Sequence, residues 1–384
     1  MSNPDYPLNS LATGRWFKLI CGASWQHLPA IRNLTLVYTL AGADCIDMAA
    51  DPAVIQVAQE ARRTAMVWGD IAEQMGWGYQ GKPWLMVSLN DGEDPHFRKA
   101  HFDPAACPVD CPRPCERICP TQAIVWGESM VSGITGVIEE RCYGCGRCWP
   151  VCPSNLIQSR SYVSTPTVIL PLVMAQDIDA IEIHTQVGHE ADFRRLWQVI
   201  QPWVEQLKLV AVSCPNQEDV IDYLWTLVEV MQPRPRTLVW QTDGRPMSGD
   251  IGAGTTRAAI ELGSKVLGAG LPGYVQLAGG TNDQTVPQLQ RRGLIGPGRS
   301  FNQCHLAGVA YGSYARVLLS PLLESLNGVT PARTLETVGS PYQSSGGCSR
   351  DSPAATSQQI EAYPELLSQA VRVARTLVSQ IKSC

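Results

Sequence analysis

The sequence predicts an α/β protein in which eight parallel strands close into a TIM-like (β/α)8 barrel with an insertion after the third strand. Three observations support this fold class. Short β-type runs alternate with amphipathic helical segments, the alternation gives eight units, and one connection is much longer than the others and is rich in cysteine. A doubly wound open sheet fits the same alternation and is kept as the alternative.

Each predicted strand is a mostly apolar run that ends in glycine or polar residues. The segments between the runs repeat apolar residues at helical spacing, as in 51–75, where Asp51 and Pro52 form a typical helix start. This order of strand and helix predicts successive βαβ units. The eight strands are expected at 17–24, 44–50, 84–90, 180–185, 208–215, 237–243, 273–280 and 308–316.

The connection between the third and fourth strands runs from residue 91 to residue 179 and contains the cysteine-rich stretch. Loops that follow barrel strands lie at the carboxyl ends of the strands, where ligands bind in such folds. An insertion at this place is therefore expected to lie next to a functional face. The predicted division is 1–94 for the first part of the barrel, 95–165 for the insertion, 166–330 for the second part of the barrel, and 331–384 for a linker and a docking helix.

The predicted docking helix covers roughly 359–382 and follows a stretch too rich in Ser, Gly and Pro to build a core. A lone helix of this length is marginally stable in water, so we expect it to pack against the barrel. The apolar positions expected to face the barrel are Leu366, Ala370, Val373, Leu377 and Ile381.

Residues 142–153 read CYGCGRCWPVCP, which is the C-x2-C-x2-C-x3-C-P run of bacterial ferredoxins. Residues 107–120, CPVDCPRPCERICP, contain a similar motif, since CERICP has the same C-x3-C-P ending as CWPVCP. In such repeats the fourth cysteine of each run binds the other cluster. The spacing therefore predicts a ferredoxin-like module with two [4Fe–4S] clusters. One is assigned to Cys142, Cys145, Cys148 and Cys119, and the other to Cys107, Cys111, Cys115 and Cys152.

Zinc is the alternative occupant, because four-cysteine sites also bind it. Zinc sites usually pair two C-x2-C knuckles, whereas here three cysteines crowd together and a proline follows the fourth in both runs. The first run departs from the pattern, with C-x3-C-x3-C spacing and three prolines between its cysteines. We expect its cluster to be less regular and to degrade more easily to a three-iron form. The other six cysteines show no ligand spacing and are expected to be small buried residues: Cys21, Cys45, Cys214, Cys304, Cys348 and Cys384.

The last two predicted strands end in glycine-rich sequences, LAGGTND and AYGSYAR. Barrels that bind phosphate often use the loops after strands seven and eight, where glycines expose backbone N–H groups. These loops could therefore hold FMN or another phosphate ligand, although glycines also simply turn the chain. The predicted residues are Gly279, Gly280, Thr281, Gly312 and Ser313. Polar residues at other strand ends could line a pocket: Asp47, Asn90, Glu182, His184 and Asp243.

The composition limits the kinds of partner and the cellular location that we expect for this protein. The 384 residues carry a formal net charge of −5, without a basic run, so neither nucleic acid nor a membrane surface is an expected partner. No signal peptide is recognisable, and the longest apolar run is far too short to span a bilayer. We therefore expect a soluble cytoplasmic protein that is not an integral membrane protein. In that reducing compartment, clustered cysteines bind metal more often than they form disulfides.

The combination of FKLICGAS, both cysteine runs and VQLAGGTNDQT resembles the cyanobacterial light-dependent period protein family (LdpA) over nearly the whole chain. The resemblance implies an iron–sulfur redox sensor that reports the state of photosynthetic electron transport to the circadian clock and modulates its period by light. It also implies partners among clock input proteins or redox carriers such as quinone. Residue by residue, only the eight cysteines of the two runs carry over, as cluster ligands.

The rival interpretation is a flavin-dependent oxidoreductase that passes electrons between two [4Fe–4S] clusters and a substrate at the barrel mouth. No nucleophile–base pair stands out in the sequence, and no catalytic residue is assigned. We therefore favour an electron-carrying regulatory protein over an enzyme.

Overall fold

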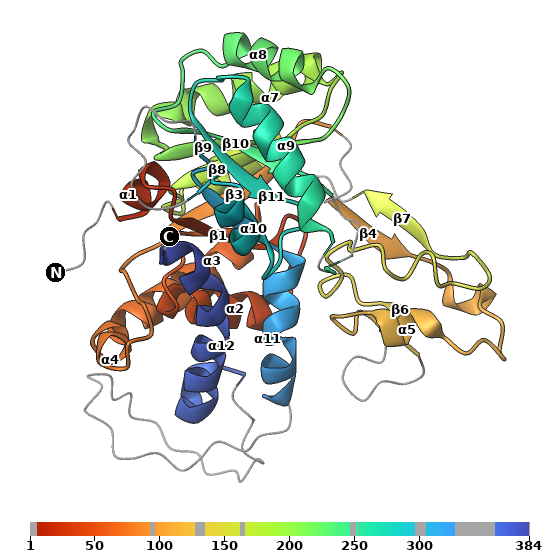
Figure 1. Ribbon diagram of the computed structural model, residues 1–384. Helices are drawn as coiled ribbons and strands as arrows, with labels where there is room; N and C mark the ends of the chain where they lie inside the picture. Colours follow the sequence, from red (N-terminus) through yellow and green to blue (C-terminus); the bar gives the residue numbers. More distant parts are fainter. Residues whose placement is uncertain are drawn as a thin grey trace.

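The computed structural model describes residues 6–92, 97–126, 135–161, 166–245, 251–252, 254–295, 305–326 and 358–383. Its central feature is a closed barrel of eight parallel strands (Figure 1). The strands are β1 (Trp16–Gly22), β2 (Cys45–Ala49), β3 (Trp84–Asn90), β8 (Ala180–His184), β9 (Leu209–Pro215), β10 (Leu238–Asp243), β11 (Tyr274–Ala278) and β12 (Gly308–Tyr311).

The strands are neighbours in the order β1-β12-β11-β10-β9-β8-β3-β2, and β2 returns to β1. The closure confirms the predicted parallel α/β barrel and excludes an open sheet. The other expected strand ends lie within two residues of the observed ones, and the largest error is at the last strand. The last strand was expected to reach residue 316, but it ends at Tyr311, because helix α11 (Ser313–Ser325) begins two residues later, after Gly312.

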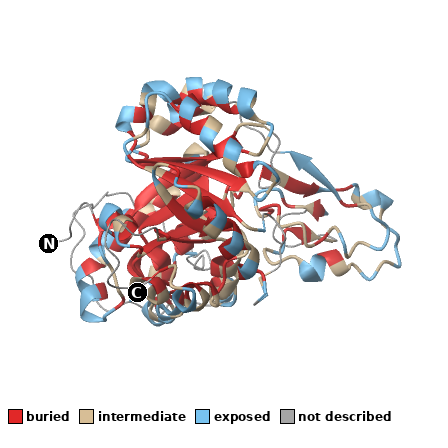
Figure 2. Cartoon of the chain, turned by 45° about the horizontal axis from the view of Figure 1, so that its top comes forward, coloured by how far each residue is buried: buried red, intermediate tan, exposed pale blue. Residues whose placement is uncertain are grey.

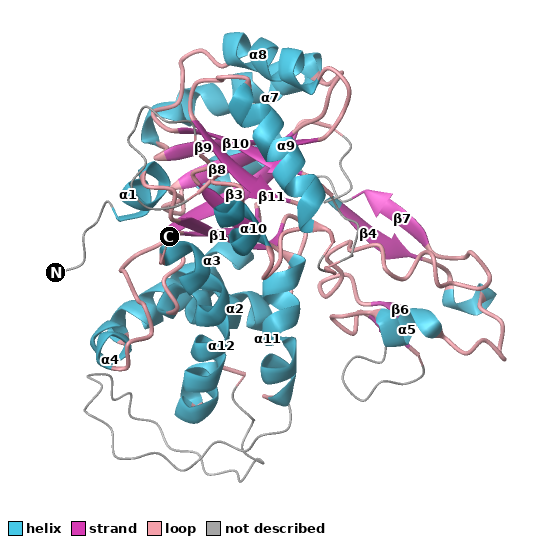
Figure 3. Ribbon diagram, in the orientation of Figure 1, coloured by secondary structure: helices cyan, strands magenta, loops and turns pink. Residues whose placement is uncertain are grey.

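Helices connect successive strands around the barrel (Figures 1 and 3). The start at Asp51 is as expected, since its carboxylate accepts hydrogen bonds from the backbone N–H of Ala53 at 2.8 Å and of Val54 at 3.3 Å. Besides α11, the described helices outside the cysteine-rich segment are α1 (Tyr6–Ala12), α2 (Leu28–Leu40), α3 (Pro52–Val67), α4 (Gly69–Gln74), α6 (Pro166–Met174), α7 (Glu190–Ile200), α8 (Val220–Val230), α9 (Thr256–Gly268), α10 (Thr285–Arg291) and α12 (Pro364–Lys382).

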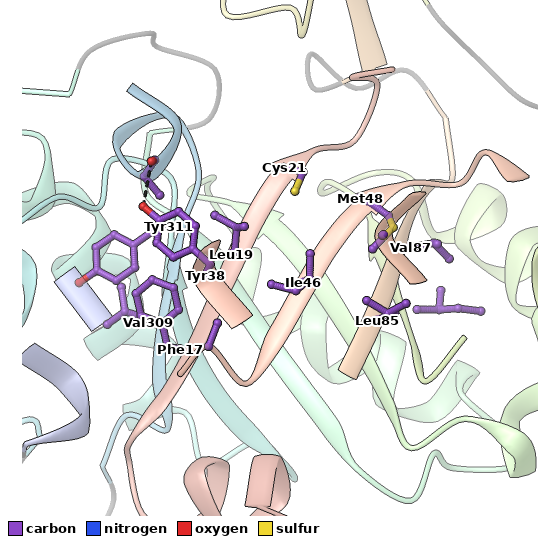
Figure 4. Packing of buried hydrophobic residues seen from close by; sticks show 14 of the residues in the cluster. Phe17, Leu19, Cys21, Tyr38, Ile46, Met48, Leu85, Val87, Val309 and Tyr311 are labelled. Atoms are coloured by element: carbon purple, nitrogen blue, oxygen red, sulfur yellow. Dashed lines mark hydrogen bonds between the residues drawn. The ribbon is translucent and has the colours of Figure 1, made fainter. Parts of the chain in front are cut away.

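Side chains alternate along each barrel strand between the surrounding helices and the barrel interior. In β1, Phe17 and Leu19 join the large core between strands and helices (Figure 4), and Figure 2 shows the strands as the most buried part of the molecule. Trp16 belongs to a separate apolar cluster together with residues from the beginnings of other strands. Lys18, between Phe17 and Leu19, faces the interior and is fully buried.

Helix α12 packs on α2 and α11 (Figure 1). It starts later than predicted, because the short 3-10 helix Ile360–Ala362 precedes Pro364, and Pro364 begins the α-helix. Ala370, Leu377 and Ile381 are buried as expected, whereas Leu366 and Val373 are only partly buried. The residues that complete the buried face are Leu367, Val371, Ala374 and Val378. The linker at 331–357 lies outside the described residues.

The end of α12 is held by a buried ion pair. Lys382 Nζ lies 2.6 Å from Asp44 Oδ1, and Asp44 Oδ2 also accepts a hydrogen bond from the backbone N–H of Phe17 at 2.7 Å. Burial lowers the pKa of the Lys382 ammonium and raises the pKa of the Asp44 carboxyl. Each charge therefore depends on the other for compensation.

We predict that Lys382→Met lowers the free energy of unfolding by about 3 kcal/mol, because it leaves the Asp44 carboxylate buried without its cation. Urea unfolding of the full chain measures this change. The double variant Asp44→Asn/Lys382→Met should recover part of the loss, since no unpaired charge is left. A double variant less stable than Lys382→Met would contradict this account. The exposed Lys265→Met on α9 is the matched control, with an expected change below about 0.5 kcal/mol.

The chain between β3 and β8 builds small elements outside the barrel, seen beside it in Figure 1. Strand β4 (Arg98–His101) pairs antiparallel with β7 (Gln158–Ser161), so the two ends of this segment lie side by side. Strand β5 (Ile124–Val125) pairs with β6 (Gly136–Val137). The remaining elements are the 3-10 turn Pro104–Ala106 and helix α5 (Pro114–Ile118). Among the described helices, none has the length and apolar character required to cross a membrane.

Candidate functional site

Four cysteines from the two sequence runs surround one cavity. Cys142, Cys145 and Cys148 come from the second run, and Cys119 comes from the first. The tight loop of the second run is possible because Gly144 and Gly146 both adopt positive φ, at 72° and 73°. The structure thus brings together the four residues that the sequence assigns to one cluster.

Backbone N–H groups point at these sulfurs. The N–H of Ala100 donates to Cys142 Sγ at 3.3 Å, and the N–H of Ala123 donates to Cys119 Sγ at 3.2 Å. The indole Nε1 of Trp149, which lines the same cavity, is buried and has no hydrogen-bond partner among the described residues. Sulfur-directed donors and an unsatisfied buried N–H suit the sulfide and thiolate acceptors of an iron–sulfur cluster.

Burial raises the pKa of the Cys142 and Cys145 thiols and brings that of Cys148 to about 12. The negative charge that Cys119 can carry raises the pKa of all three further. Only the thiolate binds metal, so these sulfurs need a strong positive charge beside them to ionise. Bound iron is such a charge, which fits the residues present.

The other four thiols are those that the sequence assigns to the second cluster: Cys107, Cys111, Cys115 and Cys152. The pKa of Cys107 is raised first by desolvation and then by Cys111 and Cys115. Burial raises the pKa of Cys115, and Cys152 from the second run raises it further. Burial would also raise the pKa of Cys152, but backbone N–H groups of residues 154–157 lower it. The thiols that act on Cys107 and Cys115 therefore belong to the assigned set, and the pairing itself stays a prediction.

The two runs fold alike around their last cysteines. The N–H of Gln122 donates to Cys119 O at 3.2 Å, and the N–H of Asn155 donates to Cys152 O at 3.2 Å. Gln122 and Asn155 have positive φ values of 49° and 50°. The internal repeat seen in the sequence is therefore a repeat of backbone conformation. No three His, Cys, Asp or Glu side chains of the described segments converge on one point where a single metal ion could bind.

The cysteine-rich segment is fastened to the barrel at the loop after β1. Trp25 Nε1 donates to Arg141 O at 3.0 Å, and its ring meets the Tyr143 ring edge-on. Lys99 Nζ donates at 2.9 Å to Gln26 Oε1 and at 2.9 Å to Glu139 O. The second cysteine run therefore has a fixed position relative to the barrel.

Tyr143 lies between two cysteines of the second run and also contacts α11, the helix that follows the last barrel strand. The guanidinium carbon of Arg316 on α11 lies 4.1 Å from the centre of the Tyr143 ring. Arg316 Nη1 donates to the carbonyls of Ile20 at 2.8 Å and Cys21 at 2.9 Å, and Nη2 donates to Ser313 Oγ at 3.1 Å. This positive charge is thus held in place beside the cysteine run.

A second cavity lies at the carboxyl ends of the barrel strands, and we refer to it as the mouth cavity. Tyr143 and Cys145 from the cysteine-rich segment form part of its wall. Both residues also line the cavity of the four cysteines. The two cavities therefore share a wall. The barrel residues around the mouth cavity are Ile20, Gly22, Ala23, Asp47, Ser88, Glu182, His184, Gln241, Asp243, Arg245, Ile251, Gly279, Gly280, Thr281, Gly312, Ser313, Tyr314 and Arg316.

The floor of the mouth cavity rests on a buried polar network centred on Lys18. Lys18 Nζ contacts the Glu182 carboxylate, lies 3.3 Å from Asp47 Oδ2 and donates to Gln241 Oε1 at 2.9 Å. Gln241 Nε2 donates to Glu182 Oε1 at 2.6 Å, and His184 Nε2 lies 3.0 Å from the same oxygen. Ligand sites commonly combine a cavity with a few convergent polar groups, as this network does beneath the mouth cavity.

All five residues predicted to hold a phosphate lie on the wall of the mouth cavity, which joins the loops after β11 and β12. Four of the five additional strand-end residues also line it, and Asn90 does not. Asn90 Nδ2 donates to Gly92 O at 2.6 Å instead. Cys21, Cys45 and Cys214 are buried as expected, whereas Cys304, Cys348 and Cys384 lie outside the described residues.

Several residues of the mouth were not identified from the sequence. Lys18 carried a signal, since it is a single charge inside the apolar run FKLICGAS and would face inward by strand alternation. Gln241 and Ser88 are also polar residues inside apolar strand runs, but they are uncharged and are therefore a weaker signal. Arg316 and Tyr143 carried none, because their contact joins segments far apart in the chain.

Comparison with known proteins identifies a family that covers most of the chain. A family model described as the LdpA Fe-S cluster-binding domain matches residues 107–163, and one described as the light dependent period A C-terminal domain matches residues 172–380. The chain is 49% identical to Light dependent period A of Synechococcus elongatus over 378 residues, which cover 98% of this chain and 94% of that protein. The fold and the cysteine-rich site thus define an iron–sulfur-binding α/β-barrel protein. The chain belongs to the light-dependent period A (LdpA) family.

Proposed function

We propose that this protein is an iron–sulfur redox sensor that couples the photosynthetic redox state of the cell to the circadian clock and modulates the clock's period by light. The barrel is of the TIM type, and residues 95–165 form a ferredoxin-like module inserted after its third strand. The relative's name, Light dependent period A, supports a role in a light-dependent period. The matched iron–sulfur-binding domain supports the cofactor.

We further propose that each group of four thiols holds one [4Fe–4S] cluster. The first comprises Cys119, Cys142, Cys145 and Cys148, and we call its cluster the proximal cluster because two of its surrounding residues reach the barrel mouth. The second comprises Cys107, Cys111, Cys115 and Cys152. When bound, such a cluster supplies a one-electron redox centre whose potential depends on nearby charge and hydrogen bonds.

The observation that carries the proposal is the shared wall made by Tyr143 and Cys145. Any change of charge at Cys145 acts directly on the groups of the mouth cavity, and Arg316 lies against Tyr143. A unit charge acts on another about 8 Å away with about 2 kcal/mol at an effective dielectric constant of about 20. About 1.4 kcal/mol suffices for a tenfold change in partner affinity. The redox state can therefore control a partner that binds at this face.

A potentiometric titration tests the proposal. Anaerobically purified protein is titrated alone, with clock input proteins, and with a quinone analogue. A partner that prefers one redox state tenfold should shift the potential by about 59 mV, because binding and reduction are thermodynamically linked. Potentials that no binding partner moves would contradict the sensor. A yellow protein with flavin absorbance and substrate turnover would instead establish the oxidoreductase.

A further inference from the structure

The mouth cavity has opposite charge at its floor and its rim. Asp47, Glu182 and Asp243 line the floor and are 1%, 0% and 3% exposed. Their oxygens already accept hydrogen bonds from Ser88, Gln241 and Ser213, and each carboxylate has further lone pairs that can accept from a ligand. Lys18 already compensates part of their charge, through Glu182 and Asp47. Neutral hydroxyl donors therefore suit this floor better than a full cation does.

The rim carries positive charge. Arg316 is 7% exposed and is fixed by two carbonyl groups, while Arg245 lies on the wall that follows β10. Gly312 and Ser313 bring the amino end of α11 to the same wall. The first N–H groups of a helix lack acceptors within the helix and attract anions. A buried guanidinium beside these N–H groups selects a phosphate over a neutral group.

Floor and rim together define the ligand. We propose that the mouth cavity binds a small phosphorylated polyol, with its phosphate at Arg316 and Ser313 and its hydroxyl groups at the floor carboxylates, and that this binding and reduction of the proximal cluster oppose each other. A free sugar phosphate and the ribityl phosphate of FMN share this chemistry. The coupling rests on the proposed function, because it takes Cys145 as a cluster ligand.

The direction of the coupling follows from charge. Reduction adds one electron from a one-electron donor to the proximal cluster, with no bond formed or broken, and makes its surroundings more negative. A phosphate beside Arg316 also adds negative charge, and Arg316 lies 4.1 Å over the ring of Tyr143. Each event therefore disfavours the other, so the ligand binds the oxidised protein more tightly and lowers the potential. A tenfold affinity ratio corresponds to about 59 mV.

Calorimetric titration of the anaerobic full-length protein tests the proposal, with ribose 5-phosphate, FMN and unphosphorylated ribose as probes. We expect saturable binding of at least one phosphorylated probe and none of ribose. FMN binding without ribose 5-phosphate binding identifies a flavin site, and the reverse identifies a sugar phosphate site. If ribose 5-phosphate binds, we expect its affinity to fall about tenfold after the protein is reduced with dithionite. If only FMN binds, we expect FMN to lower the reduction potential of the proximal cluster by about 59 mV.

Ser313→Glu should abolish binding, since its carboxylate occupies the place of the phosphate beside Arg316. The matched control is Thr167→Glu, an exposed residue in the first turn of α6, which should bind like the unaltered protein. Absence of binding by both phosphorylated probes overturns the site, and equal affinity in both redox states overturns the coupling. Iron and sulfide analysis of the same sample shows whether the clusters are present, so failure of ligand binding can be told apart from failure of the proposed sensor function. If protein without iron still binds the probe, the ligand site is supported and the proposed sensor function is overturned.

Discussion

Replacing Cys119 with alanine is expected to destroy the cluster that binds the second cysteine run, although Cys119 belongs to the first run. Its sulfur lines the cavity of Cys142, Cys145 and Cys148, and the Ala123 N–H holds it there at 3.2 Å. With three ligands left, a four-iron cluster loses iron. The unaltered protein should contain about eight irons and eight sulfides, and the variant about half.

Cys115→Ala is the matched variant, because Cys115 lies in the same run as Cys119 but is assigned to the other cluster, and Cys152 and Cys111 raise the pKa of its thiol. Spectroscopy of the reduced proteins should show that the two variants lose different clusters. Loss of the same cluster in both would refute the proposed exchange of ligands. Cys214→Ala, a buried cysteine of β9 outside both groups, should retain all the iron. Stoichiometric zinc without broad visible absorbance would refute the cluster assignment altogether.

Lys18→Met is expected to cause the largest loss of stability among single changes in the barrel interior. Lys18 is fully buried and contacts the carboxylates of Glu182 and Asp47. Methionine preserves most of the volume but leaves two buried carboxylates without their cation. Removing one partner of a buried ion pair costs about 3–5 kcal/mol, so the urea midpoint should fall accordingly with little change in the slope m.

The double variant Lys18→Met/Glu182→Gln separates charge from packing. Glutamine keeps the shape of Glu182 and can still hydrogen-bond with Gln241, so part of the stability should return. If the double variant is as unstable as Lys18→Met, the loss comes from packing and the network does not act through charge. Iron analysis of both variants shows whether the cysteine-rich segment stays intact.

The eight strands were predictable because each is an apolar run of limited length between polar or glycine-rich residues. Residues 84–90 match β3 fully. The last strand begins at residue 308 as predicted, but the prediction continued past Gly312, where the strand has ended. In α12 the hydrophobic spacing identified the helix but not all of its buried face. Val371 and Val378 became buried and Val373 only partly so, because the surfaces of α2 and α11 decide which stripe packs.

Sequence by itself predicted the order of strands and helices, because that order depends on spacing along the chain, and its resemblance to known sequences indicated the family. The division of the eight cysteines into two groups of ligands rests on the same kind of spacing and stays a prediction. The sequence also named many residues that line the mouth cavity, but only the tertiary structure decided which side chains from distant segments contact one another there. Closure places β1 beside β12, which puts the Ile20 and Cys21 carbonyls within reach of Arg316. Inward alternation turns Lys18 and Glu182 toward each other across the barrel. Such contacts follow from the curvature and register of the sheet, which no short stretch of sequence contains.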